Sequence, residues 1–238
     1  MLKGRWSSSL LTKTSVFTVG QNNTTPYITT LLSAYPGNVT EFVARVEAAY
    51  PLGQNGLNAP YDQIAQIFTE FIFQCPQAKW AEDTASIGNP TWRYYYNASF
   101  TNTQAYPNLG AYHASEIPIV FGTRQEAGTT TQEYALSNAM RSTWANFAKN
   151  PQRGPGWNQI ETGTASQVLS GASAQVLGGQ YTSFNGSVLD GTWNLGVWGD
   201  RLNVLGGGIT VIDQQEVDSR CRLFEPIYEL IAGTAGST

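Results

Sequence analysis

Four stretches of the chain repeat apolar residues at the three- and four-residue spacing that places them on one face of an α-helix. The predicted helices run from Thr40 to Tyr50, from Pro60 to Cys75-Pro76, from Thr130 to Asn150, and from near Asp213 to Ile231. Thr130 and Glu133 have the spacing of a capping box, whereas Pro226 should kink or split the last helix. The helical phase directs Cys75 and Cys221 toward a core.

Segments that favour β-strands are fewer. The aromatic run Trp92 to Ser99 predicts one strand, and Leu202 to Ile212 predicts two short strands around a turn at Gly206-Gly207-Gly208. Between Gly154 and Asp200 the chain is rich in Gly, Ser and Thr and almost uncharged, which predicts a long surface loop packed by its tryptophans. No repeat or break in composition marks two domains. The sequence therefore predicts helices around a small sheet.

Charge and hydropathy exclude several classes of partner. Lys and Arg total 13 against 17 Asp and Glu, with no basic run that could follow a phosphate backbone, so we expect no nucleic-acid partner. No segment approaches the ~20 continuous apolar residues of a membrane helix, and the first residues lack the apolar part of a signal peptide. We therefore expect neither a membrane span nor a secretion signal in this chain.

Other features nevertheless suit a secreted surface. Only 13% of the residues are charged, and five N-x-[ST] sequons are present, which mark exposed loops if the chain enters a secretory route. The sequons begin at Asn22, Asn23, Asn38, Asn97 and Asn185. We expect an extracellular glycoprotein, although the chain itself carries no signal peptide.

The two cysteines and the single histidine limit cofactor chemistry. Cys75 and Cys221 are too far apart for a CxxC metal or redox motif, so they form either one long-range disulfide or two buried free thiols. One histidine and two distant cysteines cannot make a metal site, and Gly206-Gly207-Gly208 fits a turn better than a phosphate loop. We expect no metal and no cofactor.

His113 is the residue whose surroundings point most clearly to chemistry. A lone histidine is more often structural than catalytic, but histidine is also the commonest general base. In the segment Ala111 to Gly122 a glycine-containing loop precedes His113 and an apolar run with Pro118 follows it. This segment resembles the histidine segment of the type B carboxylesterase, lipase and cholinesterase family, closest to its secreted fungal branch.

The resemblance extends along most of the chain. It includes Phe73-Gln74-Cys75-Pro76, Trp92 to Asn97, Trp144 to Pro151 with Gly154 to Trp157, Asn194 to Gly199, and Ser219 to Leu230. It implies that residues 15–238 are the C-terminal part of an α/β-hydrolase fold, an incomplete sheet flanked by helices, and that residues 1–14 are an atypical segment. The resemblance also implies that a disulfide joins Cys75 to Cys221.

The same resemblance implies roles for two side chains. His113 would be the base of a serine, acid and histidine triad. Glu116 would support it from nearby; the alternative for Glu116 is an ordinary solvated or capping carboxylate.

The triad partners of His113 are missing from the sequence. No G-x-S-x-G elbow occurs; the nearest segment, Gly171 to Gln175, lacks the second glycine and lies after His113, whereas the family places the serine first. In the family's register Lys13 stands where the acidic residue would be and Thr14 where a glycine would be. A lysine cannot accept the imidazole N–H bond that fixes the tautomer.

The leading hypothesis is therefore the histidine-bearing part of a carboxylic-ester hydrolase that acts on ester or lipid substrates and is inactive alone. The alternative is a non-catalytic, cholinesterase-like binding or adhesion protein, which Lys13 favours and the pairing of His113 with Glu116 disfavours. A free-standing small esterase that uses another serine is a third hypothesis. The acyl and alcohol preferences cannot be deduced from these residues.

Overall fold

A five-stranded sheet lies at the centre of the computed structural model, which describes residues 5–10, 15–106, 109–155, 159–160, 176–177, 195–199, 209–212 and 218–235. Its strands are β1 (Arg5–Leu10), β2 (Thr91–Asn97), β3 (Val176–Leu177), β4 (Leu195–Gly199) and β5 (Ile209–Ile212), in the order β1-β2-β4-β3-β5. The first four run parallel in this order, and β5 is antiparallel to β3 and β4. In the register of the sheet, Arg93 on β2 lies opposite Ser7 of β1 on one side and Leu195 of β4 on the other.

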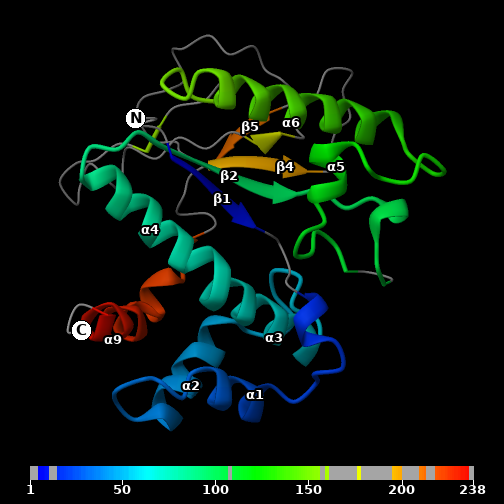
Figure 1. Ribbon diagram of the computed structural model, residues 1–238. Helices are drawn as coiled ribbons and strands as arrows, with labels where there is room; N and C mark the ends of the chain where they lie inside the picture. Colours follow the sequence, from blue (N-terminus) through cyan, green and yellow to red (C-terminus); the bar gives the residue numbers. More distant parts are fainter. Residues whose placement is uncertain are drawn as a thin grey trace.

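Helices cover both faces of this sheet. They are α1 (Thr24–Leu31), α2 (Val39–Ala49), α3 (Pro60–Thr69), α4 (Cys75–Ser86), α5 (Ile117–Phe121), α6 (Thr131–Lys149) and α9 (Glu225–Ala235). Figure 1 shows α6 along one side of the sheet and α4 along the other, with α1, α2 and α3 grouped beyond α4. Short 3-10 turns occur at Ser15–Thr18, Thr101–Thr103 and Cys221–Leu223. The α/β-hydrolase architecture expected from the resemblance has this same mixture of a mainly parallel sheet and covering helices.

The predicted strands are only partly those observed. The strand predicted at Trp92 to Ser99 is confirmed as β2, and the end of the predicted Leu202 to Ile212 region is β5. The glycine turn at 206–208 lies outside the described residues. The loop predicted between Gly154 and Asp200 is wrong where β3 and β4 form, and β1 was not predicted at all. A parallel strand is buried on both faces and need not alternate polar with apolar residues, so β4, whose five residues include Gly196 and Gly199, has no periodic signal.

The predicted helices agree better with the structure. The helix predicted at Thr40 to Tyr50 is α2, and Asn38 caps it by accepting a hydrogen bond from the Glu41 amide. The helix predicted at Thr130 to Asn150 is α6, with the Thr130 side chain accepting from the Glu133 amide. Each such cap contributes about 1 kcal/mol of stability.

The second predicted helix does not stop at Cys75-Pro76. After α3 the chain continues through a π-helical segment, Glu70–Gln74, and directly into α4. Pro76 is tolerated because it lies in the first turn of α4, where its missing N–H would have no partner within that helix. The start of the fourth predicted helix, near Asp213, lies outside the described residues. Its described part is split at Pro226 as expected: Cys221–Leu223 is a 3-10 turn, and Pro226 lies in the first turn of α9.

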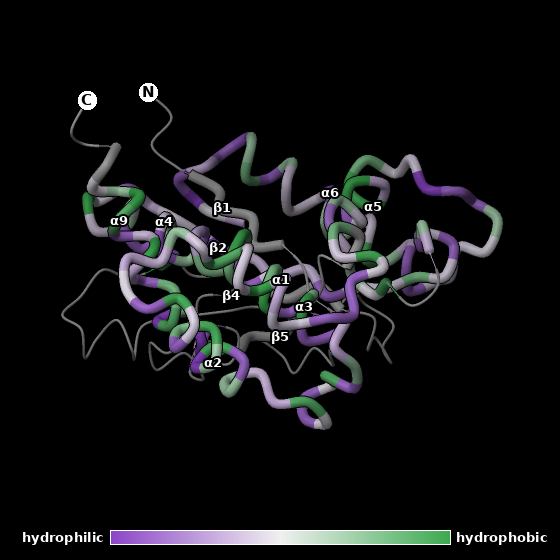
Figure 2. The backbone as a smooth tube through the Cα atoms, turned by 90° about the horizontal axis from the view of Figure 1, so that it is seen from below, coloured by the Kyte–Doolittle hydropathy of each residue, from purple (hydrophilic) through white to green (hydrophobic). Residues whose placement is uncertain are grey.

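Two apolar clusters hold these elements together. One packs β2 against α5 and α6 through Trp92, Tyr94, Tyr96, Ile119, Leu136 and Met140. The other packs α1, α2 and α3 against the C-terminal part through Ile28, Phe42, Val46, Phe71, Cys75, Phe224 and Ile227. Cys75 is buried as predicted, whereas Ile231, which is in phase with the apolar residues of the last predicted helix, is 55% exposed. In Figure 2, α5 is mostly hydrophobic, α9 mixes hydrophobic with hydrophilic residues, and the loop between α5 and α6 is mainly hydrophilic.

Candidate active site around His113

His113 lies on the loop that follows the carboxyl end of β2 and leads into α5. In open parallel sheets, ligands bind in the crevice outside the carboxyl ends of the strands. Two hydrogen bonds fold this loop on itself: Gln104 Nε2 donates to the Gly110 carbonyl at 3.0 Å, and the Tyr112 hydroxyl donates to the Thr103 carbonyl at 2.6 Å. The histidine is therefore presented by an internally braced loop.

The backbone next to His113 adopts an unfavourable conformation. Ala114 has φ of 70°, in the left-handed region that residues with a Cβ rarely occupy. The amide of Ser115 donates to the Tyr112 carbonyl at 2.9 Å, and that of Ile117 donates to the Ala114 carbonyl at 3.1 Å, so the strained residue sits in a tight turn. Strain of this kind is concentrated at functional sites, where surrounding structure maintains it.

Two phenylalanine rings pack near the imidazole of His113. The ring centroids of Phe17 and Phe73 each lie 5.2 Å from that of His113, and Phe68 lies 5.9 Å from Phe17 and 6.2 Å from Phe73. Phe17 is 51% exposed, so the cluster borders the surface. These residues come from three segments before β2, which brings the first part of the described chain to the histidine loop.

The Nδ1 atom of His113 is buried and has no hydrogen-bond partner among the described residues. In a catalytic triad this nitrogen donates to the acidic residue, which fixes the tautomer and leaves Nε2 free to act as base. Lys13, at the position of that acid, lies outside the described residues, so its place in the site stays a prediction. The buried Nδ1 is therefore placed where a triad acid would bind it, but no acidic residue among the described residues does so.

Glu116 is buried beside the same turn, only 9% exposed. Burial raises the pKa of its carboxyl group, and Oε2 has no hydrogen-bond partner among the described residues. The Tyr96 hydroxyl on β2 is also buried; burial, and then the charge of Glu116, raise the pKa of Tyr96. Glu116 is at the N-cap position of α5, but its side chain makes no capping bond. The solvated and capping alternatives for Glu116 are therefore wrong, while its supporting role stays a prediction.

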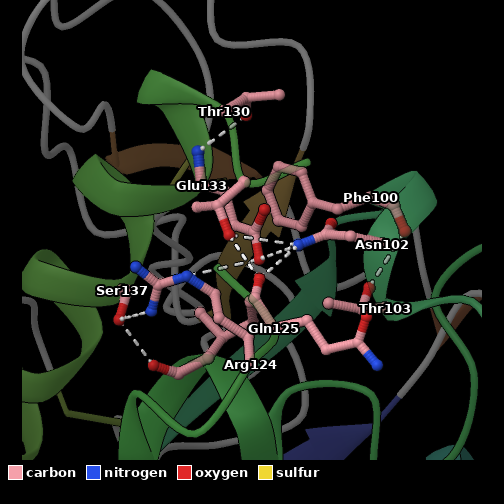
Figure 3. A network of polar contacts seen from close by, with 10 residues as sticks. Phe100, Asn102, Thr103, Arg124, Gln125, Thr130, Glu133 and Ser137 are labelled. Atoms are coloured by element: carbon pink, nitrogen blue, oxygen red, sulfur yellow. Dashed lines mark hydrogen bonds and ion pairs between the residues drawn. The ribbon is translucent and has the colours of Figure 1, made fainter. Parts of the chain in front are cut away.

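A buried polar network fastens the segments on both sides of His113 to α6 (Figure 3). Glu133 is fully buried, accepts a hydrogen bond from Asn102 Nδ2 at 3.2 Å, and pairs with Arg124 Nε at 3.4 Å. Arg124 Nη1 donates to Ser137 Oγ at 3.0 Å, and Ser137 Oγ donates to the Ile119 carbonyl in α5 at 2.7 Å. Sequence reasoning placed Glu133 in a capping box, but its carboxylate serves this network.

A second set of buried charges lies at the start of the π-helical segment. Glu70 is fully buried, forms an ion pair with Arg220, and accepts hydrogen bonds from the Tyr50 hydroxyl and Gln66 Nε2, both at 2.7 Å. Burial, and then the charge of Glu70, raise the pKa of Tyr50. Burial alone would lower the pKa of Arg220, but its hydrogen bond and charge interaction with Glu70 raise it. No sequence motif marks Glu70, because a buried ion pair depends on tertiary contacts.

Cys75 and Cys221 form a disulfide with their Cα atoms 5.2 Å apart, the pairing that the resemblance implies. The free-thiol alternative is therefore wrong. Among the described residues no group of His, Cys, Asp and Glu could hold a metal ion, and no helix there is long and apolar enough to cross a membrane. The described sequon asparagines, Asn22, Asn23, Asn38 and Asn97, are all exposed, and Asn185 lies outside the described residues.

Comparison with known proteins agrees with these observations. The sequence model of the carboxylesterase family matches residues 11–183. The chain is 42% identical over 89 residues to a chlorogenic acid esterase of Aspergillus niger, covering 37% of this chain and 17% of that protein. It is 34% identical over 131 residues to secreted lipase 5 of Gibberella zeae, covering 52% of this chain and 24% of that protein.

Solved structures show the same fold at low sequence identity. PNB esterase superposes with a TM-score of 0.57 at 17% identity, over 92% of this chain and 38% of that one. Aspergillus niger EstA gives a TM-score of 0.61 at 14% identity, over 94% of this chain and 40% of that one. The chain thus spans less than half the length of these relatives. With an α/β-hydrolase architecture and a family match over most of its length, the chain belongs to the carboxylesterase family.

Proposed function

We propose that this chain supplies the histidine-bearing part of a carboxylic-ester hydrolase, with His113 as the general base. In this mechanism Nε2 takes the proton of a serine hydroxyl as its oxygen attacks the ester carbonyl, and then gives the proton to the departing alcohol. The observation that carries the proposal is the position of His113, the chain's one histidine, on a braced loop after β2 within the family match. The family relatives include proteins named as an esterase and a lipase, so the proposed substrates are carboxylic esters, lipids included.

The nucleophile and the triad acid would come from residues outside this sequence. It contains no G-x-S-x-G elbow, and Lys13 occupies the place of the acid in the family register. Without a serine no acyl-enzyme can form, so we propose that the chain is inactive alone. A fluorophosphonate probe, which labels an activated serine, should leave the isolated chain unlabelled; covalent labelling would contradict this part of the proposal.

The role of His113 can be tested by restoring a nucleophile. We would join to this chain an N-terminal segment of a carboxylesterase-family protein that carries a G-x-S-x-G elbow and an acidic residue at the triad position, and assay p-nitrophenyl acetate hydrolysis. His113→Gln in that fusion should lower kcat by a factor on the order of 10⁴ to 10⁶. A fusion that hydrolyses the ester equally well with and without His113 would refute the assignment.

Glu116 has a proposed supporting role in the same site. Its buried carboxyl group lies three residues after His113, beyond the strained turn, and supporting groups of this kind hold catalytic side chains in productive geometry. Glu116→Gln in the fusion should lower kcat while leaving KM nearly unchanged. A change confined to KM would argue for a substrate-binding role instead.

We further propose an extracellular, glycosylated protein in which residues 15–238 form the family part and residues 1–14 are atypical. Support comes from the exposure of Asn22, Asn23, Asn38 and Asn97, and from the relative named as a secreted lipase. Expression through a secretory host should give a product whose mass falls after treatment with peptide N-glycosidase. An unchanged mass would contradict the proposal.

A further inference from the structure

Four residues near the C-terminus fasten the π-helical segment Glu70–Gln74. We call Asp218, Arg220, Cys221 and Tyr228 the C-terminal clamp. Arg220 pairs with Glu70, Asp218 accepts from Gln74 Nε2 at 3.2 Å, Cys221 is disulfide-bonded to Cys75, and the Tyr228 hydroxyl donates to the Phe71 carbonyl at 2.6 Å. Residues about 150 positions apart in sequence thus meet at the one π-helical turn of the described chain.

The clamp is rigidly built and is tied to the sheet. Glu70 is fully buried, so loss of Arg220 would leave its carboxylate charged, out of water and without its cation, at a large free-energy cost. Asp218 also accepts from Arg93 Nη1 at 2.7 Å, and Arg93 is a fully buried residue of β2. The clamp therefore contacts both the π-helical segment and β2, the strand that precedes the His113 loop.

The residue of this segment that reaches the histidine is Phe73. Its ring lies 5.2 Å from the imidazole of His113 and stacks at 6.1 Å on Phe17, while its sequence neighbours Gln74 and Cys75 are held by the clamp. In a π-helix the backbone bonds run from residue i to i+5, which alters the angular spacing of side chains from that of an α-helix. The winding of Glu70–Gln74 therefore decides where the Phe73 ring points.

We propose that the C-terminal clamp positions His113 through Phe73. The clamp fixes the π-helical segment, the segment directs the Phe73 ring, and the ring packs against the imidazole. Arg220 is then a positioning residue that contacts neither the imidazole nor a substrate. The importance of this for catalysis rests on the proposed function, whereas the positioning itself can be measured in the absence of activity.

The single histidine makes a direct test possible, because the imidazole C–H signals in a ¹H–¹³C NMR spectrum of the full chain belong to one residue. Nearby aromatic rings shift these signals through their ring currents. Phe73→Leu removes one of these rings and should displace both imidazole signals. The direction of this chemical-shift change is the reference for the other variants. Arg220→Met and the double variant Cys75→Ser, Cys221→Ser should move the signals in that same direction, and Arg220→Lys should restore them in part.

Two controls separate positioning from general destabilisation. Lys79→Met breaks the exposed Lys79–Asp83 pair on α4. Val43→Ala loosens the buried cluster that contains Phe71, against which Cys221 and Tyr228 also pack, but it leaves the ion pair, hydrogen bonds and disulfide of the clamp in place. Both should leave the imidazole signals at their wild-type positions. The proposal is overturned if a folded clamp variant leaves the signals unmoved, or if Val43→Ala moves them as far as a clamp variant does. If Arg220→Met does not fold, the double cysteine variant and mild reduction of the wild-type disulfide give the same decision. If the clamp variants displace the imidazole signals as expected but the fusion does not hydrolyse the ester, the result counts against the proposed function alone.

Discussion

Removing the carboxylate of Glu133 should destabilise the protein more than the change of one side chain suggests. Glu133 is fully buried and the side chain of its partner, Arg124, is only 7% exposed, so Glu133→Ala would leave a guanidinium group out of water without a counter-charge. Breaking a buried pair in this way costs about 3 to 5 kcal/mol. The lost acceptor for Asn102 adds about 1 kcal/mol, so we expect a decrease of roughly 4 to 6 kcal/mol in the free energy of unfolding.

Removing both charges should cost much less. The double variant Arg124→Met, Glu133→Leu replaces the pair by apolar groups of similar size, which is often close to neutral. It still loses the stacking of Arg124 over the Tyr134 ring at 4.4 Å, worth about 1 kcal/mol, and the bond to Ser137. A double-mutant cycle with the single variants Arg124→Met and Glu133→Leu should therefore give a coupling energy of at least about 2 kcal/mol between the two positions.

Equilibrium unfolding in urea, followed by tryptophan fluorescence, measures these differences. The matched control is the exposed pair Lys79 and Asp83, whose removal should cost less than about 1 kcal/mol. A cost below about 1 kcal/mol for Glu133→Ala, or a double variant as unstable as the two single variants added together, would refute the view that these charges are buried and dependent on each other.

Three further predictions concern the histidine turn and the disulfide. Ala114→Gly removes a Cβ from a left-handed residue and should stabilise the chain by about 1 kcal/mol, shown by a higher Tm; a lower Tm would contradict the strain at this position. Because burial raises the pKa of Glu116 above its unfolded value, the wild type should lose stability relative to Glu116→Gln as the pH rises through the folded pKa, and the difference should vanish below the unfolded pKa; a difference that grows toward acid pH would have the wrong sign. Replacing Cys75 and Cys221 by serine should cost about 5 kcal/mol in the chain-entropy account for a separation of 146 residues, and a loss under about 1 kcal/mol in urea unfolding would show that the denatured chain is already restricted.

Helices could be predicted from the sequence because their signals are local. The apolar spacing of α2 and the capping pattern at Thr130 are complete within one or two turns, and both helices form where expected. Strand β1 could not be predicted, since its three consecutive serines have little strand preference and its order depends on pairing with β2. The extension of α3 into α4 could not be predicted for a related reason: a Cys-Pro pair normally predicts a helix end, and here Pro76 instead lies in the first turn of α4, directly after the π-helical segment.

In the candidate site, too, some residues could be identified from the sequence, whereas their packing could not. His113 and Glu116 were identified by resemblance, and the structure adds what resemblance does not contain: the aromatic rings against the imidazole and the strained turn that follows it. Phe17 and Phe73 are ordinary apolar residues in the sequence. Their contact with His113 follows from the packing of three distant segments, which no local pattern records.

Of the two long-range links at the π-helical segment, the disulfide between Cys75 and Cys221 could be expected from the sequence, and the ion pair between Glu70 and Arg220 could not. The chain has two cysteines, so once a disulfide is assumed only one pairing is possible, whereas 17 acidic and 13 basic residues leave far too many ion pairs to choose among. The disulfide greatly reduces the number of possible ion pairs near the π-helical segment. Arg220 adjoins Cys221, and Glu70 lies just before Cys75 across the π-helical turn, so closing the disulfide brings this carboxylate within reach of the guanidinium group. Burial then decides the pairing, because a carboxylate at the fully buried position of Glu70 is tolerated only beside a cation. The ion pair is thus a consequence of the disulfide and the π-helical winding together, and a sequence in which either is lost should not keep an acidic residue at this position.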